Sequence, residues 1–327
     1  MPVDPVLPGY FADPFVTSTE DGWVAYGTSD PVVRDGLAFR VRRSSDLVEW
    51  HDVEPVLRVD LAIGTDYWAP EVVRDERGWW MLFSAGHGIA GHRIRVARSD
   101  SAFGPFEDTG VDLSPEETFA IDPHPFTDAD GSRWLFFARD VPDAEQRGTH
   151  LAVRPMADWT RPAGPASEVL APNALWQRYE ADRDMYGRRA DWYTLEGPNV
   201  VRRGDEYVLL YSGGSWEGPD YGVAHATAPS PDGPWRHEAT QRPTVLSHAL
   251  TGLSGPGHDS LVPLPGGGSA IAFHAWDDAG AVRRMHLATV RWQRTTPTVD
   301  LDAPPRPAAA RTSPPGTRTA STTRRRE

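Results

Sequence analysis

Three carboxylates stand in similar local sequence, each followed closely by a proline. Asp13 and Asp122 lie in apolar stretches directly before a proline, and Glu196 follows an aromatic and apolar run and precedes Gly197-Pro198. Apolar neighbours remove a carboxyl group from water, and this desolvation favours the protonated form that a general acid needs at neutral pH. A single Asp-Pro pair commonly does no more than initiate a turn. The recurrence of the pattern favours a shared site.

Three carboxylates at one place suit the hydrolysis of a glycosidic bond. One protonates the leaving oxygen, another activates a water molecule on the opposite face of the sugar, and a third can hold the acid in its protonated form through like-charge coupling. The sequence offers no support for seryl or cysteinyl catalysis or for nucleotide binding, because it has no cysteine, no Gly-x-Ser-x-Gly elbow, no Walker loop and no Rossmann fingerprint. Glycoside hydrolysis is therefore the chemistry that these residues favour.

The elements that must position these residues are short strands. Apolar and period-2 stretches dominate, separated by turn residues, and few segments have the pattern of an amphipathic helix. One unit of two strands, their turns and an aromatic-marked edge recurs five times at roughly 55–75 residues. Repeats of this kind predict an all-β, five-bladed β-propeller, with a β-sandwich or a two-domain β protein as the alternative. The repeated units begin near Gly22, Gly78, Gly131, Asp205 and Ser269.

A propeller would bring the carboxylates together. The first strand of each blade lines the central channel, so residues just ahead of each repeat should converge on the axis. Because proline cannot donate to a sheet ladder, each proline that follows a carboxylate predicts the end of regular strand structure there. The residues placed at the axis in this way are Asp13, Glu71, Asp122, Glu196 and His258.

Composition limits the partners and the location. The 327 residues carry a net charge of −13, and the segment 303–327 contributes +5 from six Arg and one Glu, which leaves −18 for residues 1–302. A body this acidic repels nucleic acid and anionic membranes but admits neutral ligands. No cysteine is present, Met1–Gly9 lacks a signal-peptide pattern and no apolar run reaches transmembrane length. We therefore expect a cytoplasmic protein.

Two regions are expected along the chain. Residues 1–302 carry the repeated strand pattern and should form one catalytic propeller domain. Residues 303–327 are rich in Pro, Ala, Thr, Ser and Arg and lack apolar periodicity, so we expect a disordered tail.

The sequence resembles the family 43 glycoside hydrolases from about Pro8 to Trp292. The resemblance implies a five-bladed propeller that hydrolyses arabinose- or xylose-containing glycans by inversion. It also implies that Asp13 is the general base, Asp122 the modulator of the pKa of the acid, and Glu196 the general acid. The matching motifs are Ala12-Asp13-Pro14, Tyr67-Trp68-Ala69-Pro70-Glu71, Ile121-Asp122-Pro123, Glu196-Gly197-Pro198 and Gly257-His258-Asp259-Ser260.

Three further residues are candidates for substrate binding. Trp68 could form a sugar-stacking wall, although blade packing explains a tryptophan equally well. In similar enzymes the histidine equivalent to His258 faces the axis below the sugar, sometimes beside calcium or water, whereas a histidine satisfied by the backbone is the alternative. Arg284 could reach a sugar hydroxyl or a carboxylate, with Arg283 as its immediate neighbour. No cofactor is expected to be required; a structural calcium ion would need water ligands, because calcium prefers oxygen.

These expectations lead to one main function and its alternatives. The main one is an inverting exo-glycosidase, an α-L-arabinofuranosidase acting on arabinan or arabinoxylan oligosaccharides. A β-xylosidase or an endo-arabinanase of the same fold is the alternative within the class, and a non-catalytic sugar-binding propeller is the alternative outside it. The insertion from about Ala166 to Arg189 is expected to shape the pocket, and its removal is expected to leave the fold intact.

Overall fold

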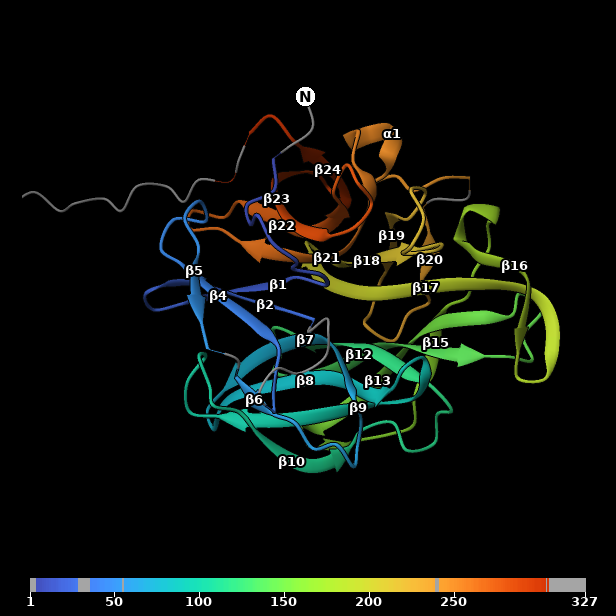
Figure 1. Cartoon of the computed structure of the whole chain (residues 1–327), viewed down its shortest axis with the longest axis horizontal. Helices are drawn as coiled ribbons and strands as arrows, with labels where there is room; N and C mark the ends of the chain where they lie inside the picture. The colour runs from blue at the N-terminus through green and yellow to red at the C-terminus, as the bar shows by residue number, and fades with distance from the viewer. Residues whose placement is uncertain (1–3, 29–35, 55, 239–240, 304, 306–327) are drawn as a thin grey trace, which may run out of the picture.

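The computed structural model describes residues 4–28, 36–54, 56–238, 241–303 and 305, and its architecture is a five-bladed β-propeller (Figure 1). Each blade is an antiparallel sheet built from consecutive strands, which confirms the predicted all-β fold. Apart from Ala303 and Pro305, the expected tail lies outside the described residues. No helix in the described part of the chain has the length and apolar character needed to cross a membrane.

The strands follow the chain from blade to blade. Blade 1 contains β1 (Phe15–Thr19), β2 (Gly22–Gly27), β4 (Arg40–Ser44) and β5 (His51–Val53), and blade 2 contains β7 (Asp66–Asp75), β8 (Gly78–His87), β9 (Ala90–Ser99) and β10 (Glu107–Asp112). Blade 3 contains β11 (Ala120–Thr127), β12 (Arg133–Val141) and β13 (Gly148–Asp158), edged by β14 (Arg161–Pro162) and β15 (Ser167–Leu170). Blade 4 contains β17 (Arg188–Arg203), β18 (Glu206–Gly213), β19 (Gly222–Ala228) and β20 (Arg236–His237), and blade 5 contains β21 (Ser254–Pro263), β22 (Ser269–Trp276), β23 (Arg283–Gln293) and β24 (Thr296–Asp300).

Short elements connect or extend the blades. Strand β16 forms a hairpin with β17, and a parallel pairing of β13 with β17 joins blades 3 and 4 into one sheet. The remaining elements are β3 (Leu37–Ala38), β6 (Leu57–Arg58), β16 (Arg178–Met185), the 3₁₀ helix η1 (Leu175–Gln177) and the helix α1 (His248–Thr251).

The core lies between the blades. Successive side chains of a strand point to opposite faces, and in β8 they enter different interfaces: Met81 and Phe83 pack with blade 1, whereas Trp80 and Leu82 pack with blade 3. Because both faces of such a strand are buried, the sequence reads as a continuous apolar run. Each of the five interfaces between neighbouring blades holds one apolar cluster of this kind.

The N-terminal segment closes the ring. The backbone N–H of Val6 donates to the carbonyl of Met285, and that of Phe11 donates to the carbonyl of Arg283, both at 2.9 Å. In Figure 1 this segment lies beside the last blade, with β1 next to β21. Ser260 adds a hydrogen bond from its hydroxyl to the carbonyl of Pro14 at 2.8 Å. Blades 1 and 5 are therefore joined although they lie at opposite ends of the chain.

The predicted strand breaks are wrong for Asp122 and Glu196, because these two carboxylates lie on continuous inner strands. Pro123 lies within β11 and Pro198 within β17, and the pairing register shifts at both places. Each shift is a β-bulge that inserts one extra residue into the inner strand. A residue inside a bulge is out of the ladder, so the missing N–H of proline removes no ladder hydrogen bond there. A bulge replaces the expected end of the strand at Asp122 and Glu196, whereas Asp13 precedes its strand.

Candidate active site

A cavity of about 210 Å³ lies where the inner strands of the five blades meet. Every blade contributes to its wall, which explains how residues far apart in the sequence come together. Five of the six residues expected to catalyse the reaction or bind the substrate line this cavity, and Arg284 does not. The five are Asp13, Trp68, Asp122, Glu196 and His258. Glu71 also lies outside the wall. Its carboxylate is 2.7 Å from Nδ1 of the buried His124 and thereby links blades 2 and 3.

The bulges direct the side chains into the cavity. At the bulges of blades 2 to 5, and just before β1 in blade 1, one residue has a positive φ, a conformation that non-glycine residues adopt rarely and that turns the chain sharply. Proline follows this residue in blades 1 to 4, and Asp259 follows it in blade 5. The five residues and their φ angles are Asp13 (50°), Ala69 (46°), Asp122 (57°), Gly197 (55°) and His258 (48°).

The preceding blade holds the backbone N–H of each bulge residue. The N–H groups of Ala69, Asp122 and His258 donate to hydroxyl oxygens at 2.8–3.0 Å, and the N–H of Asp13 donates to Nδ1 of His274 at 3.1 Å. The hydroxyl groups are supplied by Thr28, Ser84 and Ser212, respectively. These contacts satisfy buried donors and fix the direction of each inner strand.

In blade 4 the backbone N–H of the bulge residue has a different acceptor, and this contact fixes the carboxylate of Asp122. Ala138 stands opposite Ile121 at the position where Ser84 and Ser212 stand in their blades, so no hydroxyl group is present. The N–H of Gly197 donates instead to Oδ2 of Asp122 at 2.9 Å. This hydrogen bond ties the Asp122 carboxylate to the residue that follows Glu196.

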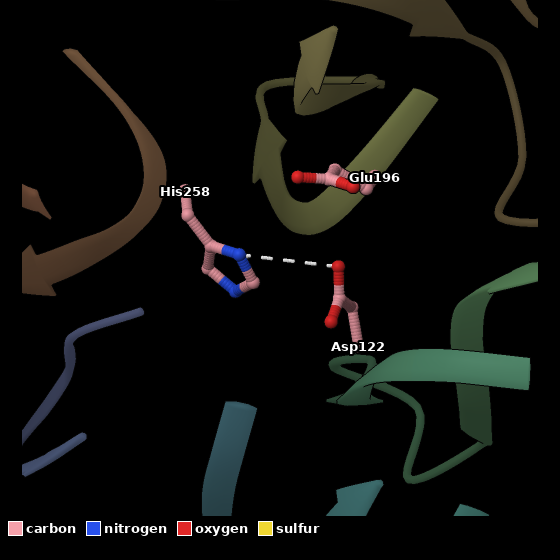
Figure 2. Close-up of side chains that lie close together, drawn as sticks. All are labelled: Asp122, Glu196 and His258. Atoms are coloured by element: carbon pink, nitrogen blue, oxygen red, sulfur yellow. Dashed lines mark ion pairs between the residues drawn. The ribbon is translucent and has the colours of Figure 1, made fainter. Parts of the chain in front are cut away.

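Asp122, Glu196 and His258 face one another at the centre of the site. Figure 2 shows their side chains pointing together from separate strands. Nδ1 of His258 lies 3.9 Å from Oδ2 of Asp122. Burial raises the pKa of Glu196 to about 7, helped by the negative charge of Asp122. Burial likewise raises the pKa of Asp122, and His258 partly opposes this. Glu196 can therefore hold a proton near neutral pH.

Asp13 has the opposite protonation behaviour. Burial alone would raise its pKa, but the charges of Arg283 and His258 outweigh it and hold the pKa of Asp13 well below its usual range. Oδ1 of Asp13 lies 3.3 Å from Nη1 of Arg283 and 3.5 Å from Nδ1 of His258, and Oδ2 accepts a hydrogen bond from Thr28 at 2.5 Å. One cavity thus contains two carboxyl groups whose pKa values are shifted in opposite directions, the pairing that acid–base catalysis uses.

His258 lies between these carboxylates and is charged by them. Burial would lower its pKa, but Asp13, Asp122 and Glu196 together raise the pKa of His258 above its ordinary value. A positive imidazolium here offsets part of the cost of burying several acidic groups.

The arginine of the site is Arg283, and the expectation for Arg284 is wrong. Arg283 contacts Asp13, and its Nη2 donates to the hydroxyl of Tyr10 at 3.0 Å, while its guanidinium lies 4.4 Å from the ring centre of Trp216. Arg284 donates to Asp277 at 3.2 Å. The two arginines are neighbours in β23, and neighbouring side chains of a strand point to opposite faces.

Replacement of these two arginines should have very different effects. Arg283→Ala is expected to lower kcat/KM by about 10- to 100-fold, because it removes the nearest positive charge from the base and raises the pKa of Asp13. The acidic limb of the pH–rate profile should move to higher pH. Arg284→Ala is the matched control and should change kcat/KM by less than about two-fold. Equal losses in both variants would contradict the placement of Arg283.

Two indole rings line the cavity. Trp68 stacks on the buried His92, with ring centres 3.8 Å apart, and burial lowers the pKa of His92 to about 4, so this imidazole is neutral near pH 7. Trp216 was not among the residues predicted from the sequence. It lies in the loop before β19 and stacks on Trp276. Tyr10, next to the Asp13 motif, was also missed. Only the aromatic character of these residues marked them in the sequence.

The segment 166–189 does not contribute to the cavity wall. It contains β15, which pairs with β13 at the edge of blade 3, and Trp176, whose ring stacks on the buried Tyr211 at 6.3 Å. Removal of the segment would expose these faces, so these contacts favour a loss of stability on deletion, and the expectation that the fold stays intact is a prediction that a melting curve of the deletion variant would test.

The acidic cluster is poorly suited to a calcium ion. Asp122, Glu196 and His258 each offer an atom within 4.8 Å of the others. Calcium prefers six to eight oxygen ligands, whereas this set provides two carboxyl groups and one nitrogen. One oxygen of each carboxyl group also accepts a hydrogen bond, from Gly197 or Tyr221. The residues fit proton transfer better than metal coordination.

Comparisons with known proteins agree with the geometry. The model of the protein family described as "Glycosyl hydrolases family 43" matches residues 3–297. The chain is 26% identical over 295 residues to a β-D-galactofuranosidase from Aspergillus niger, with 83% of this chain and 75% of the relative covered. It is 28% identical over 221 residues to an extracellular exo-α-(1→5)-L-arabinofuranosidase from Streptomyces avermitilis, with 64% and 42% covered. It therefore matches less than half of that relative's length.

Solved structures match over nearly the whole chain. A thermostable family-43 glycoside hydrolase superposes with a TM-score of 0.80 at 25% identity, and 95% of this chain and 100% of that chain are covered.

Proposed function

The chain belongs to family 43 of the glycosyl hydrolases, and we propose that it is an exo-acting α-L-arabinofuranosidase that releases terminal arabinose from arabinan or arabinoxylan oligosaccharides. The observation that carries the proposal is one cavity in which Asp13 lies beside Arg283 and His258 and Glu196 lies beside Asp122, so that the pKa values of the two acids shift in opposite directions. The arabinofuranosidase relative supports the sugar. The cavity is smaller than the roughly 300–1,000 Å³ of sites for drug-sized ligands, which favours one terminal sugar over a long chain.

Hydrolysis by inversion uses the two carboxyl groups in a single displacement. Asp13, as the general base, takes a proton from a water molecule while the water oxygen bonds to the anomeric carbon. Glu196, as the general acid, gives its proton to the glycosidic oxygen, and the bond between that oxygen and the anomeric carbon breaks with its electron pair going to the leaving group. The sugar leaves with inverted configuration and the protons return through solvent.

Asp122 maintains the acid in its protonated form. Its negative charge raises the pKa of Glu196, and the hydrogen bond from Gly197 keeps the Asp122 carboxylate beside it. Arg283 and His258 act on the other carboxylate by keeping Asp13 ionised. Trp68 and Trp216 provide aromatic faces on which the apolar face of a sugar ring can stack.

A β-xylosidase or an endo-arabinanase remains the alternative within the family. A non-catalytic sugar-binding propeller is the alternative of another class, but binding alone does not require carboxyl groups with opposite pKa shifts. The substrates are carbohydrates in either enzymatic case. A cytoplasmic location and a structural calcium ion stay predictions; the Streptomyces avermitilis relative is named extracellular. Cell fractionation and metal analysis of the purified protein would test these two.

The test compares three aryl glycosides with the same leaving group. Wild-type protein is assayed on the α-L-arabinofuranoside, the β-D-xylopyranoside and the β-D-galactofuranoside, and Glu196→Gln serves as the catalytically disabled control. Arabinoside preference that the variant loses supports the proposal, and NMR of the first-formed sugar should show inversion. Preference for the xyloside or the galactofuranoside would contradict the proposed arabinose specificity and identify a different sugar as the substrate. No turnover of any, followed by no release of sugar from arabinan, would contradict an enzymatic function.

A further inference from the structure

The phenol of Tyr221 makes the hydrogen bond that fixes one oxygen of Glu196. Its hydroxyl donates to Oε1 of Glu196 at 2.6 Å, and the tyrosine side chain is completely buried. Burial, together with the charge of Glu196, raises the pKa of Tyr221 well above its usual range, so the phenol keeps its proton. Tyr221 is not part of the cavity wall and cannot meet the substrate directly.

The ring of Tyr221 is held in place from two sides. It stacks nearly parallel on the imidazole of His274, with an interplanar angle of 6° and ring centres 5.9 Å apart. Gly257 lies against the ring, and a Cβ atom at that position would be 2.1 Å from Cε1 of Tyr221. His274 in turn accepts the backbone N–H of Asp13. Tyr221 thus packs between the blade that carries Glu196 and the residues that hold the base.

The hydrogen bond from Tyr221 gives the two carboxyl oxygens of Glu196 different roles. In a carboxylic acid one oxygen carries the proton and the other is the better acceptor. Oε1 accepts from Tyr221, and Tyr221 has no second proton to exchange. The acidic proton therefore belongs on Oε2.

We infer that Tyr221 is a positioning residue that keeps the acidic proton of Glu196 on Oε2, available to the leaving oxygen. This inference rests on the proposed function. During bond cleavage the proton passes from Oε2 to the glycosidic oxygen, and the negative charge that develops on Glu196 strengthens the hydrogen bond from Tyr221 to Oε1. Tyr221 loses no proton in this step. Its contribution should grow with the amount of proton transfer that the leaving group needs.

Tyr221→Phe tests the inference, because it removes one hydroxyl group and keeps the ring. The variant is expected to lower kcat on substrates with poor leaving groups by about 10- to 100-fold. With a dinitrophenyl leaving group, which needs no proton, the loss should be less than about three-fold. The basic limb of the pH–rate profile should move to higher pH, because the hydrogen bond lowers the pKa of Glu196 against the larger effects of burial and Asp122.

Tyr211→Phe is the matched control. Tyr211 is equally buried and belongs to the same blade, and its hydroxyl is 2.8 Å from His237 rather than from an acid of the site. This control should change neither the leaving-group dependence nor the pH profile. Equal loss on all leaving groups in Tyr221→Phe, with an unchanged pH profile, would make Tyr221 merely structural and overturn the inference, as would unchanged kinetics.

A second variant guards against loss of folding. If thermal melting shows that Tyr221→Phe does not fold, Gly257→Ala keeps the phenol but displaces its ring, and the same selective loss on poor leaving groups is expected. Uniform loss in a folded Gly257→Ala protein would overturn the inference. Wild-type protein that hydrolyses no glycoside would instead refute the proposed function, so the two failures are distinguishable.

Discussion

Glu196→Gln is expected to lower kcat on substrates with poor leaving groups by about 100- to 10,000-fold, the usual contribution of a general acid. The amide has nearly the same shape but cannot give a proton to the glycosidic oxygen. Substrate affinity should persist, because the cavity wall is otherwise unchanged. A dinitrophenyl glycoside should restore much of the rate, since its leaving group departs without protonation.

The pH dependence gives an independent check of the same residue. The acid works only when protonated, and the pKa of Glu196 is raised to about 7 by burial and by Asp122. The kcat/KM of the wild-type protein should therefore fall as the pH rises through about 7, and the fall should report the coupled Asp122–Glu196 pair. In Glu196→Gln the basic limb should disappear.

A matched control tests whether replacing a glutamate outside the cavity has the same effect on the rate and the pH profile. Glu206→Gln changes an exposed residue of the same blade and should leave the rate and the pH profile unchanged within about two-fold. If Glu196→Gln retained full activity on poor leaving groups, the acid would have to be another residue.

Asp13→Asn is expected to lower kcat by about 1,000-fold on every substrate, including those with very good leaving groups. The base activates the water molecule, and this requirement does not depend on the leaving group. The contrast with Glu196→Gln distinguishes the two roles. The variant also removes the negative charge that Arg283 and His258 face, so the pKa of Glu196 should fall and the basic limb should move to lower pH.

The measurement is kcat/KM on the dinitrophenyl and the unactivated substrate across pH, with thermal melting to verify the fold. Asp277→Asn is the control, because Asp277 pairs with Arg284 outside the cavity and its replacement should leave the rates within about two-fold. Restoration of Asp13→Asn by the activated leaving group would contradict the role of Asp13 as base. On the acidic side the wild-type rate should persist at pH values where an ordinary aspartate is already protonated, because the pKa of Asp13 is held well below its usual range.

Local sequence patterns were enough to predict the all-β fold and the three carboxylates that line the cavity. Repeated apolar strands such as Gly78–Phe83 can be recognised in the sequence, because a strand that is buried on both faces must be apolar throughout. The Asp-Pro and Glu-Gly-Pro motifs marked Asp122 and Glu196, which stand at bulges outside the ladder, and Asp13, which stands just before its strand. These features depend on local backbone geometry, and local geometry can be read from neighbouring residues.

The groups that surround those carboxylates become visible only in the folded chain. Arg283 reaches Asp13 across 270 residues of sequence, and Tyr221, just before β19, reaches Glu196 in β17 of the same blade. The choice between Arg283 and Arg284 depends on the phase of β23, which no local pattern marks. The opposite pKa shifts of Asp13 and Glu196 have the same origin: both are carboxyl groups in apolar sequence, and their protonation differs because burial and charge are set by residues that the closed ring of blades brings together.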